Sequence, residues 1–370
     1  MSIRGVTVGY TVFFDECSAG HRARLGGKNA SLVEMTAAGL PVPPGFGVTV
    51  EAFGTLGRRG GFASALGALV AEADGGRPEY LETVSGKIRS LVETQPMDPD
   101  VEAEIRSAYA ALEERCGQAD VPVAVRSSAD CEDLPDASFA GEHDTFLWVT
   151  GADEVVRHVA RCWSSVWTAR ALSYRKEMGY AEQAVCMSVG VQQMVDARAA
   201  GVAFTLNPRD GDRSQVAIDA AWGLGEGVVG GEVTPDHFLV DKVLFELTHR
   251  TTSHKAVEFR VVGGRVERAE VEPERRSIPC LTDEEVKAVA RLARAAERHY
   301  GCPQDVEWAL GSSGDVLLLQ ARAETVWSRK ARPPAGAGAG ADPLASIVST
   351  LITPVHTQRG EDPPARRSTP

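Results

Sequence analysis

Apolar residues recur at helical spacing in the first third of the chain. Residues 30–38 predict a helix that Gly39 ends before Pro41. Residues 99–115 predict a second helix, because apolar side chains fall on one of its faces. These side chains are Val101, Ile105, Ala108 and Leu112. The pattern up to about residue 115 therefore predicts a mostly helical region.

The pattern changes near residue 121. A hydrophobic strand at 121–125 runs into a polar loop, and residues 155–167 return to helical spacing. A helix at 283–300 is predicted to begin with a capping box formed by Thr282 and Glu285. The other apolar runs beyond residue 184 are short and typical of strands: 185–195, 201–206, 215–221, 237–242, 256–262, 306–310 and 316–321.

The whole pattern favours an α/β or α+β fold with mixed and antiparallel sheets in two lobes, about 1–184 and about 185–328. The length of 370 residues agrees, since a domain has roughly 150 residues. Residues 329–370 are rich in proline, glycine and alanine and contain no aromatic residue. Such a segment buries too little apolar surface to offset its chain entropy, so we expect a flexible tail.

Composition argues against several classes of protein. The 51 acidic residues outnumber the 39 basic ones, so we expect no nucleic-acid partner. No apolar run approaches the roughly 18 residues of a membrane span, and the N-terminus does not resemble a signal peptide. The seven cysteines form no C-x-x-C pair, and the eight histidines show no metal spacing. We therefore expect reduced thiols in a cytoplasmic protein without a membrane partner.

Four segments carry residues suited to phosphate or metal binding. In the first, Gly26 and Gly27 precede Lys28 at the mouth of a predicted helix. A helix N-terminus and a lysine both attract an anion, although a glycine turn with an exposed lysine has the same pattern. The segment is not a P-loop, because Arg22 stands where that motif requires glycine.

The second segment follows the strand at 121–125. Arg126 and two serines lead into an acidic, small-residue loop that ends at Gly141. Arginine's planar fork suits bidentate phosphate contact, and small residues let backbone amides approach an anion. An acidic surface loop whose carboxylates pair with Arg126 is the alternative.

The third segment, 223–231, contains five glycines around Glu226. So many glycines cost conformational entropy, a cost that is understandable where a backbone passes close to a ligand. A mobile hinge loop is the alternative.

The fourth segment predicts a β-hairpin that joins 304–309 to 316–322 through a glycine turn. Side chains alternate across a strand, so Asp305 and Glu307 share one face, as do Gln320 and Arg322 on the partner strand. If the register places both pairs on the same face, oxygen ligands and a guanidinium converge in a set suited to Mg²⁺ and phosphate. Cross-strand ion pairing on a solvated face is the alternative.

In this order, the segments resemble the N-terminal ATP-binding domain of the phosphoenolpyruvate synthase and pyruvate phosphate dikinase family, which has an ATP-grasp-type fold. The overall look is most similar to the phosphoenolpyruvate synthases (pyruvate, water dikinases). The matching stretches cover residues 22–328: GGKNASLVEM, GLPVPPGF, AVRSSADCEDLPDASFAGEHDTFL, MSVGVQQMV, GVAFTLNP, AAWGLGEGVVGGEVTPDHF, LTDEEV, ERHYGCPQDVEWA and LLLQARAETV.

The resemblance implies a role for each matching residue. Lys28 and Arg126 would bind the phosphates of ATP, and Arg322 would lie beside the transferring phosphate. Glu226 matches the glutamate of the family's glycine-rich segment. Mg²⁺ would be held by Asp305, Glu307 and Gln320. The loop that closes over the phosphates would comprise Ala137, Ser138, Phe139, Ala140 and Gly141, together with Thr145. The strand that receives the adenine would comprise Gln192, Gln193, Met194 and Val195.

The resemblance also implies an activity. ATP would be cleaved to AMP, its β,γ-phosphates would pass to a histidine of a partner domain, and water would release phosphate before onward transfer. Pyruvate is the default final acceptor. None of the eight histidines lies in a phosphohistidine motif, so we expect an ATP-binding subunit that acts with a partner chain. Ala323 departs from the family, which usually has proline there.

Other hypotheses fit the same residues. A rifampin-phosphotransferase-like subunit and a phenylphosphate-synthase-like subunit would differ only in the final acceptor. A non-catalytic ATP-binding regulatory paralogue would bind nucleotide without turnover.

Overall fold

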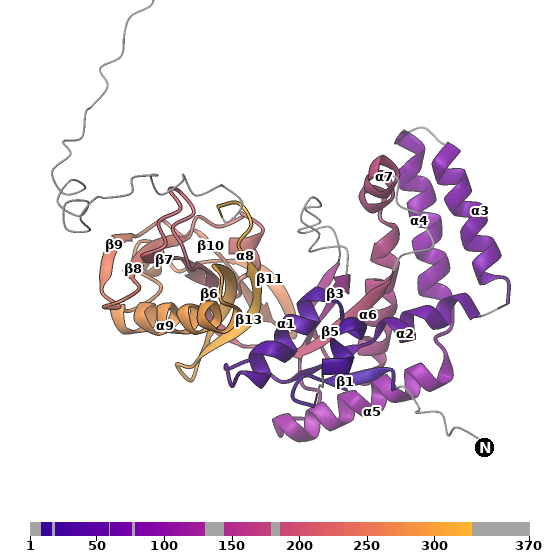
Figure 1. Ribbon diagram of the computed structural model, residues 1–370, viewed down its shortest axis with the longest axis horizontal. Helices are drawn as coiled ribbons and strands as arrows, with labels where there is room; N and C mark the ends of the chain where they lie inside the picture. Colours follow the sequence, from indigo (N-terminus) through magenta and orange to yellow (C-terminus); the bar gives the residue numbers. More distant parts are fainter. Residues whose placement is uncertain are drawn as a thin grey trace, which may run out of the picture. The chain divides into compact units, whose positions relative to one another are not determined.

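The computed structural model divides the chain into two compact units, Met1–Ser328 and Arg329–Pro370. It describes residues 9–16, 19–58, 60–75, 78–129, 144–178 and 186–327. The predicted tail therefore lies outside the described residues. The first unit contains two large sheets (Figure 1). Each sheet contributes to a separate hydrophobic core.

A five-stranded sheet forms the first lobe, in the order β1-β2-β5-β3-β4, and all of its strand pairs are antiparallel. Its strands are β1 (Thr11–Phe13), β2 (Gly45–Val48), β3 (Val123–Ala129), β4 (Thr145–Val149) and β5 (Met187–Gln193). The position of β5 corrects the predicted boundary at residue 185, because the first lobe extends to Gln193. An apolar run does not reveal its pairing partner, so order along the chain alone suggested the other lobe.

Helices build the first core together with this sheet. They are α2 (Val50–Phe53), α3 (Phe62–Gly75), α4 (Pro78–Thr94), α5 (Pro99–Cys116), α6 (Ala152–Ser164) and α7 (Ala169–Met178). Of these, α2, α5 and α6 contact strands of the sheet, and the others pack on helices. Helix α5 confirms its prediction, because the Asp98 side chain caps its first turn and Gly117 ends it in the left-handed conformation. Its residues Val101 and Ile105 lie in one core with Trp163 of α6.

A six-stranded antiparallel sheet forms the second lobe, in the order β13-β12-β6-β7-β8-β9. Its strands are β6 (Ala197–Phe204), β7 (Gln215–Trp222), β8 (Asp236–Asp241), β9 (Leu247–Thr251), β12 (Gln304–Gly311) and β13 (Val316–Ala323). Helix α9 (Asp283–Tyr300) packs on this sheet and begins at the predicted capping box of Thr282 and Glu285. Val306 and Trp308 of β12 belong to the core beneath α9, so the alternate residues of β12 point to the opposite face.

Helix α1 (Gly26–Ala37) joins the two lobes. Its Leu32 and Met35 belong to the second core, and the Ser31 hydroxyl donates to the Ala321 carbonyl of β13 at 2.8 Å. At its other end, the Asn29 amide donates to Ser128 Oγ of β3 at 3.2 Å. One helix therefore holds β3 and β13 near each other.

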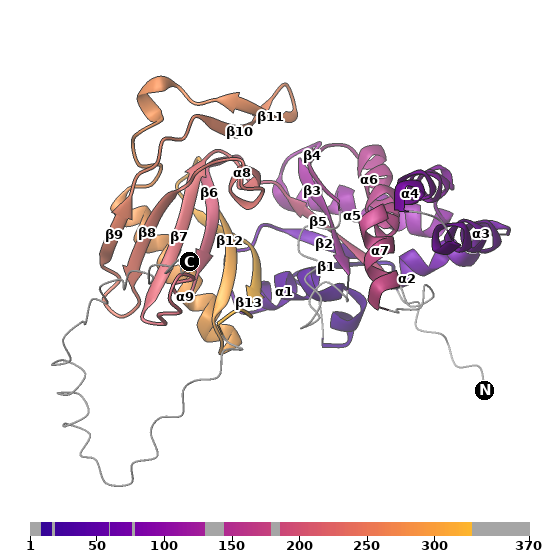
Figure 2. The same ribbon diagram turned by 90° about the horizontal axis from the view of Figure 1, so that it is seen from above.

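A two-stranded hairpin, β10 (Val257–Val262) and β11 (Arg265–Glu270), lies to one side of the six-stranded sheet (Figure 2). The sequence predicted β10 but not β11, whose positions are mostly charged. Four-residue helix α8 (Glu226–Val229) lies between β7 and β8. Short 3₁₀ turns occupy Ala19–Arg24, Gly54–Arg58, Ser165–Trp167 and Pro273–Arg275.

The described cysteines carry free thiols: Cys116, Cys162, Cys186, Cys280 and Cys302. Burial raises the pKa of the Cys280 thiol, so this group stays protonated within the core. In the part of the chain that the structure describes, no helix has the length and apolar character needed to cross a membrane.

Candidate functional site

The β12–β13 hairpin settles the register that the sequence left open. Asp305 lies directly opposite Arg322, and Glu307 lies directly opposite Gln320. Residues directly opposite each other in an antiparallel pair project to the same face. Two carboxylates, an amide and a guanidinium therefore share the face turned away from α9. We call these four residues the hairpin cluster.

The surroundings of Asp305 perturb the titration of its carboxyl group. Burial raises the pKa of its carboxyl group from 3.8 to about 6. The Arg322 guanidinium, 3.5 Å from Asp305 Oδ2, acts in the opposite direction, and the negative charge of Glu324 adds to the rise. A carboxylate held at this cost in stability is typical of a functional site.

The cluster fits a hard cation in its donor chemistry. Asp305 Oδ1 is buried and has no hydrogen-bond partner among the described residues, so one carboxylate oxygen lacks a donor. Two carboxylates and one amide oxygen are ligands that Mg²⁺ accepts, and Mg²⁺ usually completes its shell with water and phosphate oxygens. The described residues contain no group of three His, Cys, Asp or Glu side chains placed for a metal.

Arg126 reaches this cluster from the first lobe. Its Nη2 donates to Gln320 Oε1 and lies 3.6 Å from Glu307 Oε2, while its Nη1 donates to the Leu319 carbonyl at 3.3 Å. The side chain is only 12% exposed, and its Nε has no hydrogen-bond partner among the described residues. The structure therefore brings Arg126 together with the hairpin cluster, although they lie almost 200 residues apart in sequence.

Lys28 lies on the first turn of α1, close to the strand that carries Arg126. Gly26 begins this turn with a φ of +64°, and a Cβ there would lie 2.3 Å from the Ser128 carbonyl oxygen. Asn29 fixes the turn from the other side, because its Nδ2 donates to Ser188 Oγ of β5 at 3.0 Å. The N-terminus of α1, which the sequence predicted as an anion site, is therefore packed against β3 and β5.

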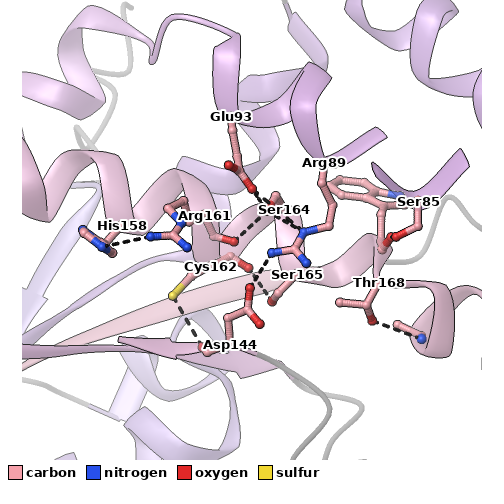
Figure 3. A network of polar contacts seen from close by, with 12 residues as sticks. Ser85, Arg89, Glu93, Asp144, His158, Arg161, Cys162, Ser164, Ser165 and Thr168 are labelled. Carbon is pink, nitrogen blue, oxygen red and sulfur yellow. Dashed lines mark hydrogen bonds and ion pairs between the residues drawn. The ribbon is translucent and has the colours of Figure 1, made fainter. Parts of the chain in front are cut away.

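Thr145 lies at the start of β4, opposite Arg126 in the sheet. A polar network fixes the residue before it: Arg89 Nη2 of α4 donates to Asp144 Oδ2 at 2.6 Å (Figure 3). Ser164 joins the network by donating to Glu93 Oε1 at 2.6 Å. These contacts hold β4 against α4 and α6. Residues 137–141, predicted to close over the phosphates, lie outside the described residues.

The segment 192–195 leads from the first sheet toward β6. Gln192 is buried, and its Nε2 donates to the Pro43 carbonyl at 3.3 Å. The amides of Gln193 and Met194 donate to the carbonyls of Pro44 and Pro122. These three donors are already engaged within the fold, and adenine binding by this segment stays a prediction.

Glu226 begins α8 in the glycine-rich segment. Burial raises the pKa of its carboxyl group, and the nearby charge of Glu232 adds to the rise. Among the described residues, its side chain interacts with Glu232 and not with the hairpin cluster, so its place in the site also stays a prediction.

The glycines of this segment have a packing role. Gly223 has a φ of +74°, and a Cβ there would lie 2.2 Å from the Phe259 carbonyl oxygen of β10. The Leu224 amide donates to the same carbonyl at 2.8 Å. Close approach to β10 therefore requires glycine whether or not a ligand binds nearby.

Three residues near Arg126, Lys28 and Asp305 were not predicted from the sequence as parts of the site. Gly190 of β5 lies opposite Arg126, and a Cβ there would lie 2.3 Å from Asn29 Oδ1. Ser188 anchors α1, and Glu324 acts on Asp305. The small residues at alternate positions of the run 185–195 were the one sequence signal that could have indicated close packing there.

Comparison with known proteins gives consistent matches. The family described as "Pyruvate phosphate dikinase, AMP/ATP-binding domain" matches residues 22–337. A probable phosphoenolpyruvate synthase of Methanothermobacter thermautotrophicus is 41% identical over 357 residues, which cover 94% of this chain and 52% of the relative. The phosphoenolpyruvate synthase of Aeropyrum pernix is 41% identical over 361 residues, covering 87% of this chain and 44% of the relative. The chain thus spans about half the length of the curated relatives it matches.

A solved structure, D-alanyl-alanine synthetase A from Vibrio cholerae, aligns with 66% of this chain and 54% of its own. The identity is 14% and the TM-score is 0.25, so this likeness adds nothing to the matches above.

Proposed function

Because the chain belongs to the pyruvate phosphate dikinase AMP/ATP-binding domain family, we propose that it binds Mg-ATP and starts a phosphoryl transfer. The observation that carries this proposal is the meeting of Arg126 with the hairpin cluster. Positive side chains for phosphate and oxygen ligands for a cation lie together there, as phosphoryl transfer requires.

We assign each residue a role in this reaction. Lys28 and Arg126 bind phosphate oxygens, and Arg322 neutralises the charge that develops on the transferring phosphate. Asp305, Glu307 and Gln320 are the residues that would hold magnesium, which when bound supplies positive charge to the phosphate oxygens. Phosphoryl transfer depends mainly on positioning and charge neutralisation, so the reaction requires no general base from either lobe.

The proposed chemistry ends on another domain. A histidine nitrogen of a partner domain attacks the β-phosphorus of ATP, the bond to the α-phosphate oxygen breaks, and AMP leaves. Water then takes the γ-phosphate as inorganic phosphate, and the remaining phosphate passes to the final acceptor. We propose pyruvate as that acceptor, because relatives at about 40% identity are named phosphoenolpyruvate synthases. A cytoplasmic location is proposed from the free thiols.

The experiment is incubation with Mg-ATP, with and without a phosphohistidine-domain protein and pyruvate, followed by ³¹P NMR. We expect phosphoenolpyruvate only when partner and pyruvate are both present. With the partner but without pyruvate, AMP and inorganic phosphate should form only up to one equivalent of the partner histidine. Phosphoenolpyruvate formed by this chain alone would overturn the partner requirement. ATP binding without AMP formation with any partner or acceptor, including rifampin and phenol, would favour the regulatory alternative.

A further inference from the structure

The contacts of Arg126 use the same oxygen atoms that the proposed metal would use. Nη2 donates to Gln320 Oε1 and lies 3.6 Å from Glu307 Oε2. These atoms belong to two of the three proposed metal ligands. A guanidinium at this distance and a divalent cation on the same oxygens would repel each other strongly, because both are positive and little water separates them.

Two features of Arg126 favour an exchange of these contacts for contacts with a phosphate. The side chain is largely buried, yet its Nε has no hydrogen-bond partner among the described residues. Nη1 donates to the Leu319 carbonyl at 3.3 Å, a long hydrogen bond to a neutral acceptor. A phosphate group offers the bidentate, charged acceptor that a guanidinium prefers to a carbonyl and an amide.

We propose that Arg126 competes with the metal for Glu307 and Gln320, and that a nucleotide phosphate draws Arg126 away from these two side chains. The metal then binds the hairpin well only after nucleotide has engaged Arg126. Metal binding and nucleotide binding therefore become interdependent through one side chain of the first lobe. This inference rests on the proposed function, because it assumes that metal and nucleotide bind at the hairpin cluster.

The coupling has a structural basis in the lobes. Arg126 belongs to β3 of the first lobe, whereas Glu307 and Gln320 belong to the second. The ion pair joins the lobes at the point where the metal would bind. Exchange of Arg126 from the hairpin to a phosphate therefore changes a contact between lobes without altering either core.

The test measures Mn²⁺ binding to the full chain in the absence of nucleotide, by electron paramagnetic resonance of free Mn²⁺. Arg126→Met removes the positive charge and keeps an apolar stem of similar length. We expect it to bind Mn²⁺ about tenfold more tightly than the wild type, the factor for one charge-assisted hydrogen bond. Adding Glu307→Gln to this variant should abolish the gain.

The control is Arg198→Met, which removes one positive charge from β6 of the same sheet, where Arg198 pairs with Glu285. It should leave Mn²⁺ affinity unchanged, which excludes a general effect of net charge. Arg126→Lys is the second variant if the methionine variant does not fold. It keeps the charge but lacks the planar fork, so a smaller gain than tenfold is expected.

Unchanged or weaker Mn²⁺ binding in the Arg126 variants would overturn the inference. Wild-type binding of Mn²⁺ with a non-hydrolysable ATP analogue separates this failure from that of the proposed function. If the wild type binds Mn²⁺ with the analogue and Glu307→Gln does not, the metal site stands and only the competition by Arg126 is refuted. If neither the wild type nor any variant binds Mn²⁺ with the analogue, both proposals fail.

Discussion

Replacing Asp305 by asparagine should raise the free energy of unfolding at neutral pH, although it removes a proposed metal ligand. Burial raises the pKa of the Asp305 carboxyl group to about 6, despite the Arg322 guanidinium nearby. The ionised carboxylate is therefore less favourable in the folded protein than in the unfolded chain. Asparagine has nearly the same shape and carries no charge.

The sign of the pH dependence follows from the two pKa values. Between about pH 4 and about pH 6, the folded protein holds a proton on Asp305 that the unfolded chain releases, so stability falls as pH rises. At about 1.4 kcal/mol per pH unit, the difference between 3.8 and about 6 corresponds to about 3 kcal/mol. The Asp305 side chain is 21% exposed, so solvent screens part of this effect, and we expect about 2–3 kcal/mol.

Urea unfolding followed by tryptophan fluorescence in EDTA measures this effect. The Asp305→Asn variant should be more stable than the wild type by about 2–3 kcal/mol near pH 8 and equally stable near pH 4. Asp315→Asn, an exposed carboxylate at the turn of the same hairpin, is the control and should change stability by less than about 0.5 kcal/mol. The reasoning is refuted if the difference between Asp305→Asn and the wild type does not depend on pH.

Three further substitutions test other parts of the structure. Lys255→Met should cost about 3–5 kcal/mol of unfolding free energy, because it leaves Asp236 charged and unpaired in a fully buried ion pair. Urea unfolding measures this loss, with Lys287→Met as the control, because the surface ion pair of Lys287 should contribute less than about 1 kcal/mol. Equal losses of unfolding free energy in the two variants would contradict the prediction. Gly190→Ala should weaken ATP binding and lower the melting temperature, because the new Cβ would displace Asn29. Calorimetry and thermal unfolding measure these two changes, and wild-type values in both would contradict the packing argument. Lys28→Met should weaken ATP binding about tenfold, and unchanged affinity in a calorimetric titration would remove Lys28 from the site.

The sequence predicted those elements whose signals are local. The α9 helix begins at the capping box of Thr282 and Glu285 because both hydrogen bonds form within one turn. The β12–β13 hairpin was predictable for the same reason, since its turn and its alternation lie within 20 residues. The sharing of one face by Asp305 and Glu307 followed from the strand period alone.

The sequence could not predict contacts that depend on the pairing of distant strands. The register of β12 on β13 decides whether Gln320 faces Glu307, and a shift of one residue would have placed them on opposite faces. The contact between Arg126 and Gln320 joins the two sheets, so it depends on their placement relative to each other, which no local pattern reveals. The position of β5 at the centre of the first sheet likewise depends on its partners β2 and β3.

The glycine-rich segment shows why one pattern can support two interpretations. Its glycines suggested close approach of a ligand, whereas the structure gives Gly223 and Gly227 a close approach to Phe259 of β10. Both interpretations require a backbone without side chains, so composition cannot separate them. Only the position of the neighbouring hairpin identifies the packing role.

The central claim is that Arg126 and the hairpin cluster form one site for Mg-ATP. Calorimetric titration of ATP into the wild type and Glu307→Gln, each with and without Mg²⁺, tests it most directly. We expect Mg²⁺ to strengthen ATP binding to the wild type and to have little effect on binding to Glu307→Gln. Equal strengthening by Mg²⁺ in both proteins would contradict the claim.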